Sequence, residues 1–360
     1  MKFIANRKEL ANAIKIAASV IANRNMLPVL VNVLIESSDA SIQITGTNLE
    51  QRISAKCNAD IEREGKTTIP AKKLIALLDS MNDSFVTIDS NESDHAEITC
   101  GTARFKLLGL PADDYPVGDE KEYERTIVIA TGELKRIINN VSYAISTRDD
   151  RPTLRGMLLD VLEDGNVCTA ATDGKRLAVA WSKSELTGAP GDAIIPLASI
   201  QTLCKMSGEK ITLKFNQNHM TANGENMQLS SKLITGTYPN YKQVIPSEFA
   251  FSSSIPTDAF QAKLSLIQTM SDGSIPVAIT IEADKILLDI ESSAIGNGHD
   301  EIEAECNILE AQRITVSPLF LMQALKCAGE KTVLKFNSPT APIMLECGSE
   351  TIALIMPVRK

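Results

Sequence analysis

One pattern recurs three times along the chain and limits the folds that it can adopt. A β-rich tripeptide, then Pro or Ser, then an amphipathic helix is found at TTIPAKKLIALLDSM, AIIPLASIQTLCKM and ITVSPLFLMQALKCA. The aligned residues Pro70, Pro196 and Ser317 stand about 120 residues apart. Proline suits a helix start because the missing N–H has no helical partner there. The chain is therefore predicted to contain three copies of one repeat.

A second pattern opens each repeat. A short strand, a polar break and a helix are predicted at MKFIANRKELANAIKIAASVI, RTIVIATGELKRIINNVSYAI and FAFSSSIPTDAFQAKLSLIQTM. The first core positions of these helices are Leu10, Leu134 and Phe260. Thr131 and Thr257 are expected to cap their helices, and an acidic residue follows each in the first turn.

Strand-like runs bounded by turn residues follow the helices. Examples are LVNVLIESSDASIQITGT, GMLLDVLEDGNVCTAAT and VAITIEADKILLDIES, each typical of a β-hairpin. The predicted fold class is α+β, with three tandem domains at residues 1–122, 126–246 and 248–360. The expected linkers are the charged segment near 118–126 and the segment near 245–251.

Composition indicates a globular protein of the cytoplasm. Hydrophobic residues make up 44% of the chain and charged residues 22%. The start lacks the apolar core of a signal peptide, and no window approaches the apolar run of about 18 residues that a membrane span needs. The seven cysteines are dispersed without a CxxC pair, which favours reduced thiols over a disulfide framework.

Charge gives two opposing indications about nucleic acid. The net charge of −9 argues against a DNA-binding protein, but it does not say where the charges lie. Cations such as Lys72, Lys73, Lys135 and Arg136 recur on the predicted helices. One interpretation is that these cations form an ordinary solvated helix face. The other is that the repeats surround an axis, so that the cations line the inside and contact only the phosphates of duplex DNA. The aromatic content of 4% argues against a protein that stacks on single-stranded bases.

The sequence shows no catalytic or metal-binding signature. His95, His219 and His299 are far apart, and HExxH, GxSxG and Walker motifs are missing from the sequence. We therefore expect no catalytic residue, no metal and no cofactor. The stretch ATDGKRLAV at 171–179 remains open to three interpretations: a hairpin turn, a cradle for a phosphorylated substrate, or the lip of a binding pocket. A monomeric repeat scaffold is a further alternative.

Several stretches in order resemble one family. They are LPVLVNVLIE, GTNLE, FKLLGLPADDYP, RPTLRGMLLD, ATDGKRLAV, SKLITGTYPNYKQVIP and IALIMPVRK. Together they resemble the β subunits of bacterial DNA polymerase III, the sliding clamps. The resemblance implies a non-enzymatic homodimeric ring with helices inside and sheets outside, which encircles double-stranded DNA without sequence preference. The implied partners are the clamp loader, the DNA polymerase III alpha subunit, other DNA polymerases and repair proteins, and no membrane.

The resemblance also implies site residues. A pocket for partner peptides would comprise Leu154, Thr172, Gly174, Lys175, Arg176, Leu177, Pro239, Gln243, Val244, Ile275, Thr340, Pro342, Leu354, Ile355, Met356, Pro357, Val358 and Arg359. For DNA it implies Arg24, Arg148 and Arg151, and the helix cations Lys72, Lys73, Lys135 and Arg136 complete the predicted DNA-binding set. The dimer interface would use Phe105, Leu107, Thr269 and Met270.

Overall fold

The computed structural model describes residues 1–22, 27–38, 40–116, 118, 122–148, 151–270, 275–292, 295–348 and 350–358. The chain forms two compact units. The first unit contains Met1–Thr131 and Gln201–Leu233, and the second contains Gly132–Ile200 and Ile234–Lys360. Within the described ranges, no helix is both long enough and apolar enough to cross a membrane.

The helices come in pairs, one pair in each repeat, as the sequence predicts. They are α1 (Arg7–Ala18) and α2 (Ala71–Ser80), α3 (Thr131–Ser142) and α4 (Leu197–Leu203), and α5 (Thr257–Gln268) and α6 (Pro318–Leu325). The predicted core positions Leu10, Leu134 and Phe260 are all buried. The repeat pattern is therefore a pattern of buried helix faces.

The first unit is built on antiparallel strands. These are β1 (Lys2–Asn6), β2 (Asn32–Ser38), β3 (Ser41–Thr47), β4 (Gln51–Arg63), β5 (Lys66–Pro70), β6 (Phe85–Ser90), β7 (His95–Cys100), β8 (Ala103–Leu108), β9 (Arg125–Ala130), β15 (Lys210–Phe215), β16 (His219–Asn223) and β17 (Met227–Lys232). Their order is β9-β15-β16-β17-β4-β1-β6-β7-β8, and β3, β2 and β5 branch from β4.

The second unit holds two further groups of strands. These are β10 (Gly156–Val161), β11 (Val167–Thr172), β12 (Arg176–Ser182), β14 (Gly191–Pro196), β18 (Phe251–Pro256), β19 (Val277–Ile281), β20 (Lys285–Ser292), β21 (Gly296–Glu303), β22 (Glu305–Cys306), β23 (Gln312–Val316), β24 (Lys331–Phe336), β25 (Ile343–Glu346) and β26 (Thr351–Ile355). The short strand β13 (Glu185–Gly188) belongs to neither group. One sheet has the order β14-β10-β11-β12-β26-β25-β24-β18-β22, and a second has the order β21-β20-β19-β23.

Neighbouring repeats are joined edge to edge by strand pairing. In the first unit β17 pairs antiparallel with β4, and Arg52 lies opposite Ser230. In the second unit β12 pairs antiparallel with β26, and Leu177 lies opposite Leu354. Each sheet therefore continues across a repeat boundary, which covers strand edges that would otherwise be exposed.

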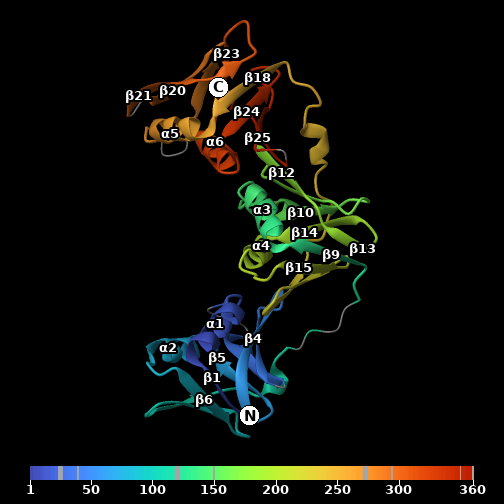
Figure 1. Ribbon diagram of the computed structural model, residues 1–360, viewed down its shortest axis with the longest axis vertical. Coiled ribbons are helices and arrows are strands. Elements are labelled where there is room, and N and C mark those ends of the chain that lie inside the picture. Colours follow the sequence, from blue (N-terminus) through green and yellow to red (C-terminus); the bar gives the residue numbers. More distant parts are fainter. Residues whose placement is uncertain are drawn as a thin grey trace. The chain divides into compact units, whose positions relative to one another are not determined.

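The helix pairs of the first and third repeats pack on the strands of their own repeats. Figure 1 shows α1 and α2 together against strands of the first repeat, and α5 beside α6 in the third. In the first repeat, Leu10 and Ile14 of α1 share a buried cluster with Leu74 of α2 and with Ile42 and Ile88 of the strands. Burial of each such side chain contributes roughly 1.5–3 kcal/mol.

The helix starts differ from the prediction at two positions. Thr131 was expected to cap α3, but it is the first residue of that helix, and its buried hydroxyl has no hydrogen-bond partner among the described residues. Asn6 caps α1, because its side-chain oxygen accepts from the backbone N–H groups of Lys8 and Glu9 at 3.0 and 3.3 Å. Thr257 was expected to cap α5, but the residue at the cap is Pro256, without a side-chain hydrogen bond. The Thr257 side chain is buried and its hydroxyl pairs with that of Thr332 at 2.8 Å. Tertiary packing therefore overrides the local capping signal.

Candidate functional site

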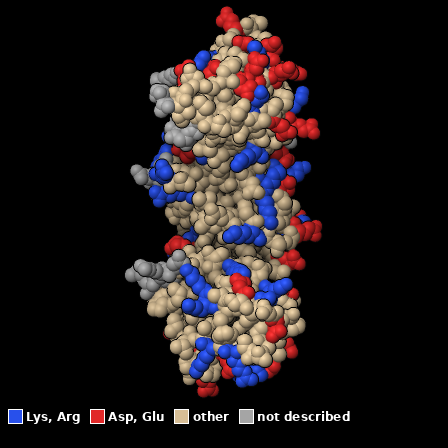
Figure 2. All heavy atoms as spheres, turned by 90° about the vertical axis from the view of Figure 1, so that its left-hand side faces the viewer, with Lys and Arg blue, Asp and Glu red and all other residues tan. Residues whose placement is uncertain are grey.

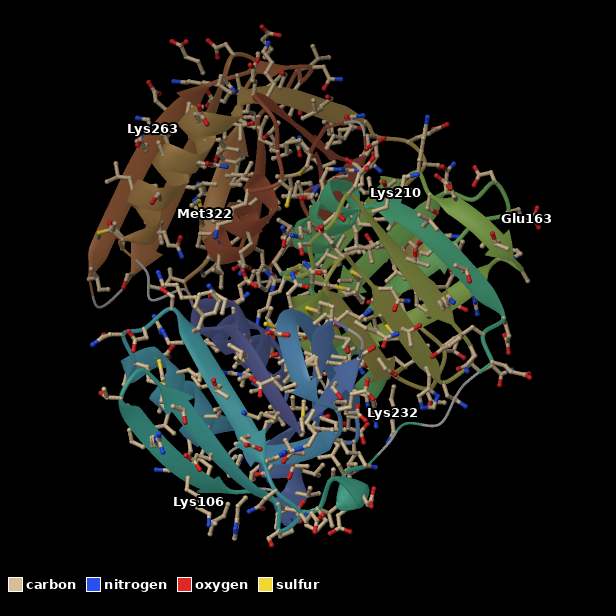
Figure 3. The ribbon with its side chains drawn as sticks, turned by 60° about the horizontal axis from the view of Figure 1, so that its bottom comes forward. Lys106, Glu163, Lys210, Lys232, Lys263 and Met322 are labelled. Carbon is tan, nitrogen blue, oxygen red and sulfur yellow. The ribbon has the colours of Figure 1, made fainter. Side chains whose placement is uncertain are left out.

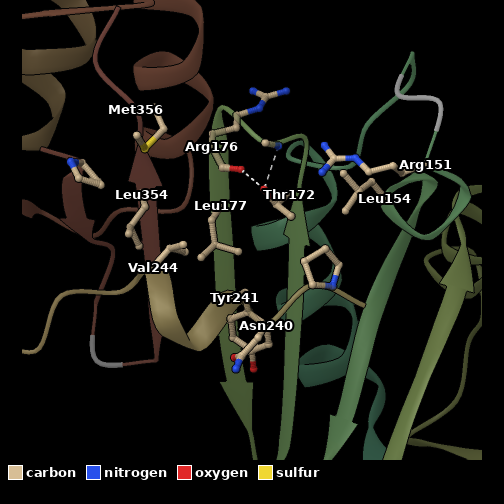
Figure 4. A pocket seen from close by; sticks show the side chains of 13 residues that line it. Arg151, Leu154, Thr172, Arg176, Leu177, Asn240, Tyr241, Val244, Leu354 and Met356 are labelled. Carbon is tan, nitrogen blue, oxygen red and sulfur yellow. Dashed lines mark hydrogen bonds between the residues drawn. The ribbon is translucent and has the colours of Figure 1, made fainter. Parts of the chain in front are cut away.

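The turn between β11 and β12 is held by its own side chains. The Thr172 hydroxyl donates to the Arg176 carbonyl at 2.6 Å and accepts from the Gly174 N–H at 3.1 Å. Asp173 Oδ1 accepts from the N–H groups of Lys175 and Arg176 at 2.9 and 3.1 Å. Gly174 has a φ of 84°, a backbone conformation that glycine adopts without a Cβ clash. ATDGKRLAV therefore forms a stiff hairpin turn (Figure 4).

An apolar pocket lies beside this turn, entirely within the second unit. Its floor is formed by Leu154, Leu177 and Leu354, which are all buried. Its cavity volume is about 190 Å³, and it opens to solvent. The lining residues are Arg151, Leu154, Thr172, Gly174, Arg176, Leu177, Pro239, Asn240, Tyr241, Val244, Pro342, Leu354 and Met356.

Two exposed apolar side chains form the rim of the pocket. Val244, at the end of a 3-10 helix, is 54% exposed, and Met356, just after β26, is 43% exposed. The backbone N–H of Met356 donates to the Lys175 carbonyl at 2.9 Å, so the chain after β26 stays fastened to the turn. Exposed apolar groups around an apolar floor suit a surface that an apolar ligand would cover.

Two buried tyrosines support the pocket from below. The Tyr238 hydroxyl accepts the Thr172 N–H at 3.1 Å, and the Tyr241 hydroxyl lies 3.2 Å from the Cys168 thiol. Burial raises the pKa of Tyr238 to about 12 and that of Cys168 to about 11, and it also raises the pKa of Tyr241. These groups therefore stay protonated and neutral at physiological pH.

The Arg176 side chain points away from the pocket floor (Figure 4). Its guanidinium lies against Phe320 of α6 and Tyr143, just after α3. Its Nε donates to Asp173 Oδ2 at 3.0 Å, and its guanidinium carbon lies 4.3 Å from the centre of the Phe320 ring. The Tyr143 ring centre is 5.4 Å away, and Nη1 donates to Gln323 Oε1. Only 10% of the Arg176 side chain is exposed.

The structure brings many of the predicted pocket residues together and leaves others out. Arg359 lies outside the described residues. Ile355 is buried in the core of the third repeat, because alternate residues of β26 face opposite sides of the sheet. The other predicted residues that do not line the cavity are Lys175, Gln243, Ile275, Thr340, Pro357 and Val358.

Sequence reasoning missed three lining residues. Asn240 and Tyr241 directly follow Pro239, and Arg151 comes shortly before Leu154, so adjacency to predicted positions was the available signal. Arg151 had been assigned to DNA, but it lies at the pocket mouth. A Cβ atom built on Gly174 would come within 3.3 Å of the Arg151 guanidinium.

The cations assigned to DNA have different environments. Lys72 and Lys73 are exposed on α2, and Arg148 is exposed in the loop after α3. Figure 2 shows Lys and Arg side chains over the helix-bearing side of the first unit. Lys135 is partly buried, and Arg24 lies outside the described part of the chain.

Arg136 is already engaged within the second unit. Its Nη2 donates to Glu133 and to Glu350, each at 2.7 Å, and to the Trp181 carbonyl at 2.8 Å. The Arg136 side chain holds the pKa of the Glu133 carboxyl below its usual value. These contacts give Arg136 a role in joining α3 to the turn before β26.

The four residues assigned to the dimer interface lie at one strand edge and one helix end. Phe105 is exposed and Leu107 half-buried on β8, the last strand in its sheet order. Figure 3 shows their neighbour Lys106 on the same strand. Thr269 caps the C-terminus of α5, where its hydroxyl donates to the Leu266 carbonyl, and Met270 packs on the core of the third repeat.

The described residues contain no group of His, Cys, Asp or Glu side chains placed to hold a metal ion. The pocket itself contributes only a few polar groups, the Thr172 hydroxyl and the Asn240 amide among them. Its chemistry is that of a site that binds an apolar segment, with a small number of groups to orient it.

Comparison with known sequences gives three adjacent matches. Residues 1–119 match the N-terminal domain of the DNA polymerase III beta subunit, residues 128–240 its central domain and residues 242–359 its C-terminal domain. The beta sliding clamp of Chlamydia muridarum is 26% identical over all of this chain and 99% of its own length. That of Caulobacter vibrioides is 28% identical over 96% of this chain and 95% of its own.

Solved structures agree with these matches. The DNA polymerase III subunit beta of Pseudomonas aeruginosa superposes with a TM-score of 0.94 at 24% identity, over 100% of both chains. The DNA polymerase sliding clamp of Caulobacter crescentus superposes with a TM-score of 0.90 at 27% identity, again over 100% of both chains. The fold is therefore three tandem clamp domains.

Proposed function

Because this chain belongs to the beta-subunit family of DNA polymerase III, the bacterial sliding clamps, we propose that two copies close into a ring around duplex DNA. The ring keeps the polymerase on its template and offers the apolar pocket to partners. The proposed domains are residues 1–122, 126–246 and 248–360. The ring has no catalytic step of its own and works in the cytoplasm.

The apolar pocket of the second unit carries this proposal. Leu154, Leu177 and Leu354 form a buried floor, while Val244 and Met356 leave apolar surface at the rim. A short peptide with one or two bulky apolar side chains would cover that surface. Each side chain that it buries would contribute roughly 1.5–3 kcal/mol. The proposed ligands are such peptide segments of the clamp loader, the polymerase III alpha subunit, other DNA polymerases and repair proteins.

Calorimetry with a peptide tests the pocket. The peptide has a Gln followed by small and then bulky apolar residues. Deletion of residues 356–360 removes Met356 from the rim, together with its hydrogen bond to Lys175. We expect this deletion to abolish binding. Leu309→Ser is the matched control, because Leu309 is fully exposed in the same unit and does not line the pocket.

Unchanged affinity in the truncated chain would refute the pocket assignment. Circular dichroism of both variants must match the parent chain, so that lost binding reports the pocket and not unfolding. The control variant is expected to bind as the parent does.

The strand edge at β8 supports the proposed ring. Phe105 is 42% exposed on an edge strand, and such an edge favours pairing with another chain. We propose that Phe105 and Leu107 of one copy meet Thr269 and Met270 of the other. Light scattering after gel filtration should give a dimer for the parent chain and a monomer for Phe105→Asp. Lys106→Asp, at the neighbouring exposed position, should remain a dimer. A monomeric parent chain at micromolar concentration would overturn the ring.

Exposed cations support the contact with DNA. Lys72 and Lys73 on α2 and Arg148 after α3 are exposed. Their side chains can therefore contact DNA phosphates whatever the base sequence. The proposed set also includes Arg24, Lys135, Arg136 and Arg151. The loaded ring should stay on nicked circular DNA and leave after linearisation. Direct binding to short duplexes should be weak and fall with salt. Lys72→Ala with Lys73→Ala should reduce loading, and unchanged loading would remove these residues from the proposal.

A further inference from the structure

We propose that Arg176 is a positioning residue, whose guanidinium ties the β11–β12 turn to α3 and α6 and so sets the shape of the apolar pocket. This inference rests on the proposed peptide-binding function. The observation behind it is that a lining residue sends its charged end away from the cavity and into a nearly closed site between aromatic rings.

Four groups from three elements enclose the guanidinium. Asp173 of the turn accepts from Nε at 3.0 Å, and the guanidinium carbon lies over the Phe320 ring of α6, 4.3 Å from its centre. Gln323, one helical turn further along α6, accepts from Nη1. Tyr143, just after α3, contributes its ring at 5.4 Å. With only 10% of the side chain exposed, the Arg176 charge is available to these partners and not to a ligand in solvent.

The tie acts on the wall of the pocket through backbone hydrogen bonds. The Arg176 carbonyl accepts from the Thr172 hydroxyl, and its N–H donates to Asp173. The carbonyl of the preceding residue, Lys175, accepts from the Met356 N–H at 2.9 Å. A guanidinium locked against α6 therefore fixes both the turn and the rim residue Met356.

Arginine is needed at this position because the site uses both the flat face of the guanidinium and its diverging N–H donors. The guanidinium stacks on an aromatic face while its N–H groups reach Asp173 and Gln323 in different directions. A lysine ammonium carries the same charge but has no plane to stack and no fixed fork. Charge alone is therefore not sufficient.

A double-mutant cycle with the same calorimetric peptide tests the proposal. Phe320 does not line the pocket, so Phe320→Leu removes the stacked ring without touching the ligand site. We expect about a 5-fold loss of affinity for Phe320→Leu and about a 10-fold loss for Arg176→Ala. The double variant should lose about 10-fold as well, because both changes break one tie. Arg176→Lys should behave like Arg176→Ala. Leu319→Ala, an exposed position on the same helix, is the control.

A role for Arg176 as a direct peptide contact predicts the opposite pattern. Phe320→Leu would then bind as the parent does, Arg176→Lys would keep most of the affinity, and the two losses would multiply. Any of these results overturns the positioning role. Emission of Trp181, the single tryptophan, which packs on the pocket cluster, should be unchanged in folded variants.

Hydrogen exchange gives a test that needs no peptide. Amide exchange in the turn and at Met356 should become at least about 10-fold faster in both Phe320→Leu and Arg176→Ala. If the parent chain binds no peptide, the proposed function fails. The exchange result still shows whether Arg176 and Phe320 hold the β11–β12 turn in place. Unchanged exchange in both variants would refute it.

Discussion

Two hairpin turns of this molecule share one backbone design and differ in their surroundings. In the β3–β4 turn, the Thr47 hydroxyl donates to the Gln51 carbonyl at 2.8 Å and accepts from the Leu49 N–H at 3.1 Å. Asn48 Oδ1 accepts from the N–H groups of Glu50 and Gln51 at 3.0 and 2.7 Å. The turn beside the apolar pocket has the same set of bonds, made by Thr and Asp in place of Thr and Asn.

The residues next to each turn decide what kind of cavity forms. Where the second unit has Leu177 opposite Leu354, the first unit has Arg52 opposite Ser230. The cavity beside the β3–β4 turn is accordingly polar, and a salt bridge of 2.9 Å between Lys232 and Glu50 lies in it. The Arg52 guanidinium donates to the Pro116 carbonyl. The comparison shows that the two turns have the same backbone geometry. The residues paired across the neighbouring strands decide whether the cavity beside each turn is apolar or polar.

Leu354→Ser should have the largest effect on peptide binding. It places a serine in the apolar pocket at the ladder position that Ser230 occupies beside the polar cavity. Leu354 is buried, and loss of its contact with a peptide side chain removes roughly 1.5–3 kcal/mol. We expect the affinity for the peptide to fall by about 30-fold or more, measured by calorimetry. The exposed Leu309→Ser serves again as control. An affinity within about threefold of the parent would mean that ladder partners do not decide the chemistry.

Tyr238 of the second unit and Tyr115 of the first, both buried, should show that the effects on stability and on peptide binding are separate. The Tyr238 hydroxyl accepts the Thr172 N–H at 3.1 Å, whereas the Tyr115 hydroxyl donates to the Thr45 carbonyl at 3.1 Å. Each change to Phe leaves a buried polar group unpaired, which costs about 1–3 kcal/mol of unfolding free energy. Only Tyr238→Phe should also weaken the peptide, by about 3- to 10-fold, since only its turn borders an apolar pocket. Equal peptide affinities in the two variants would contradict this.

Substitution of Leu49, which has a positive φ where the other turn has Gly174, should have a smaller effect, and on stability only. Leu49 has a φ of 73°, where Gly174 has 84°, and a non-glycine residue there is strained by about 1–2 kcal/mol. Elsewhere Ala is more stable than Gly by about 0.5–1 kcal/mol. At position 49 we expect Leu49→Gly to unfold at the same temperature as Leu49→Ala or a higher one. A clear advantage for Ala in thermal unfolding would show that the turn is not strained.

The pH dependence should be the smallest effect. Burial raises the pKa of Tyr238 to about 12 and of Cys168 to about 11, and raises that of Tyr241 too. These groups lose a proton only as the pH rises through those raised values, so all three stay neutral below them. Among the described lining residues no histidine occurs, whereas His219 lines the polar cavity. Peptide affinity should therefore be constant between about pH 6 and 9. A loss on either side within that window would reveal a titrating group in the pocket.

Local patterns in the sequence were sufficient to predict the repeats, the paired helices and the hairpins, while the clamp family was indicated by the resemblance of several stretches to its members. Helical spacing around Leu10 and Phe260 predicts burial, because a helix returns to the same face every 3.6 residues. The Thr-Asp-Gly turn has an equally local frame, since the hydrogen bonds of the Thr172 hydroxyl and Asp173 Oδ1 join residues at most four positions apart. Thr257 shows where local reasoning ended, because a partner from a distant strand took the hydroxyl that the helix start would have used.

Only the tertiary structure decided which side chains face the pocket. Leu177 and Leu354 are far apart in sequence, and they meet because β12 pairs with β26 in one particular register. A shift of that register by one residue would place Ile355 in the pocket and Leu354 in the core. The Arg176 guanidinium is also placed by distant partners, Phe320 and Gln323 on α6. Contacts across such separations depend on strand register and helix packing, which no local pattern in the chain encodes.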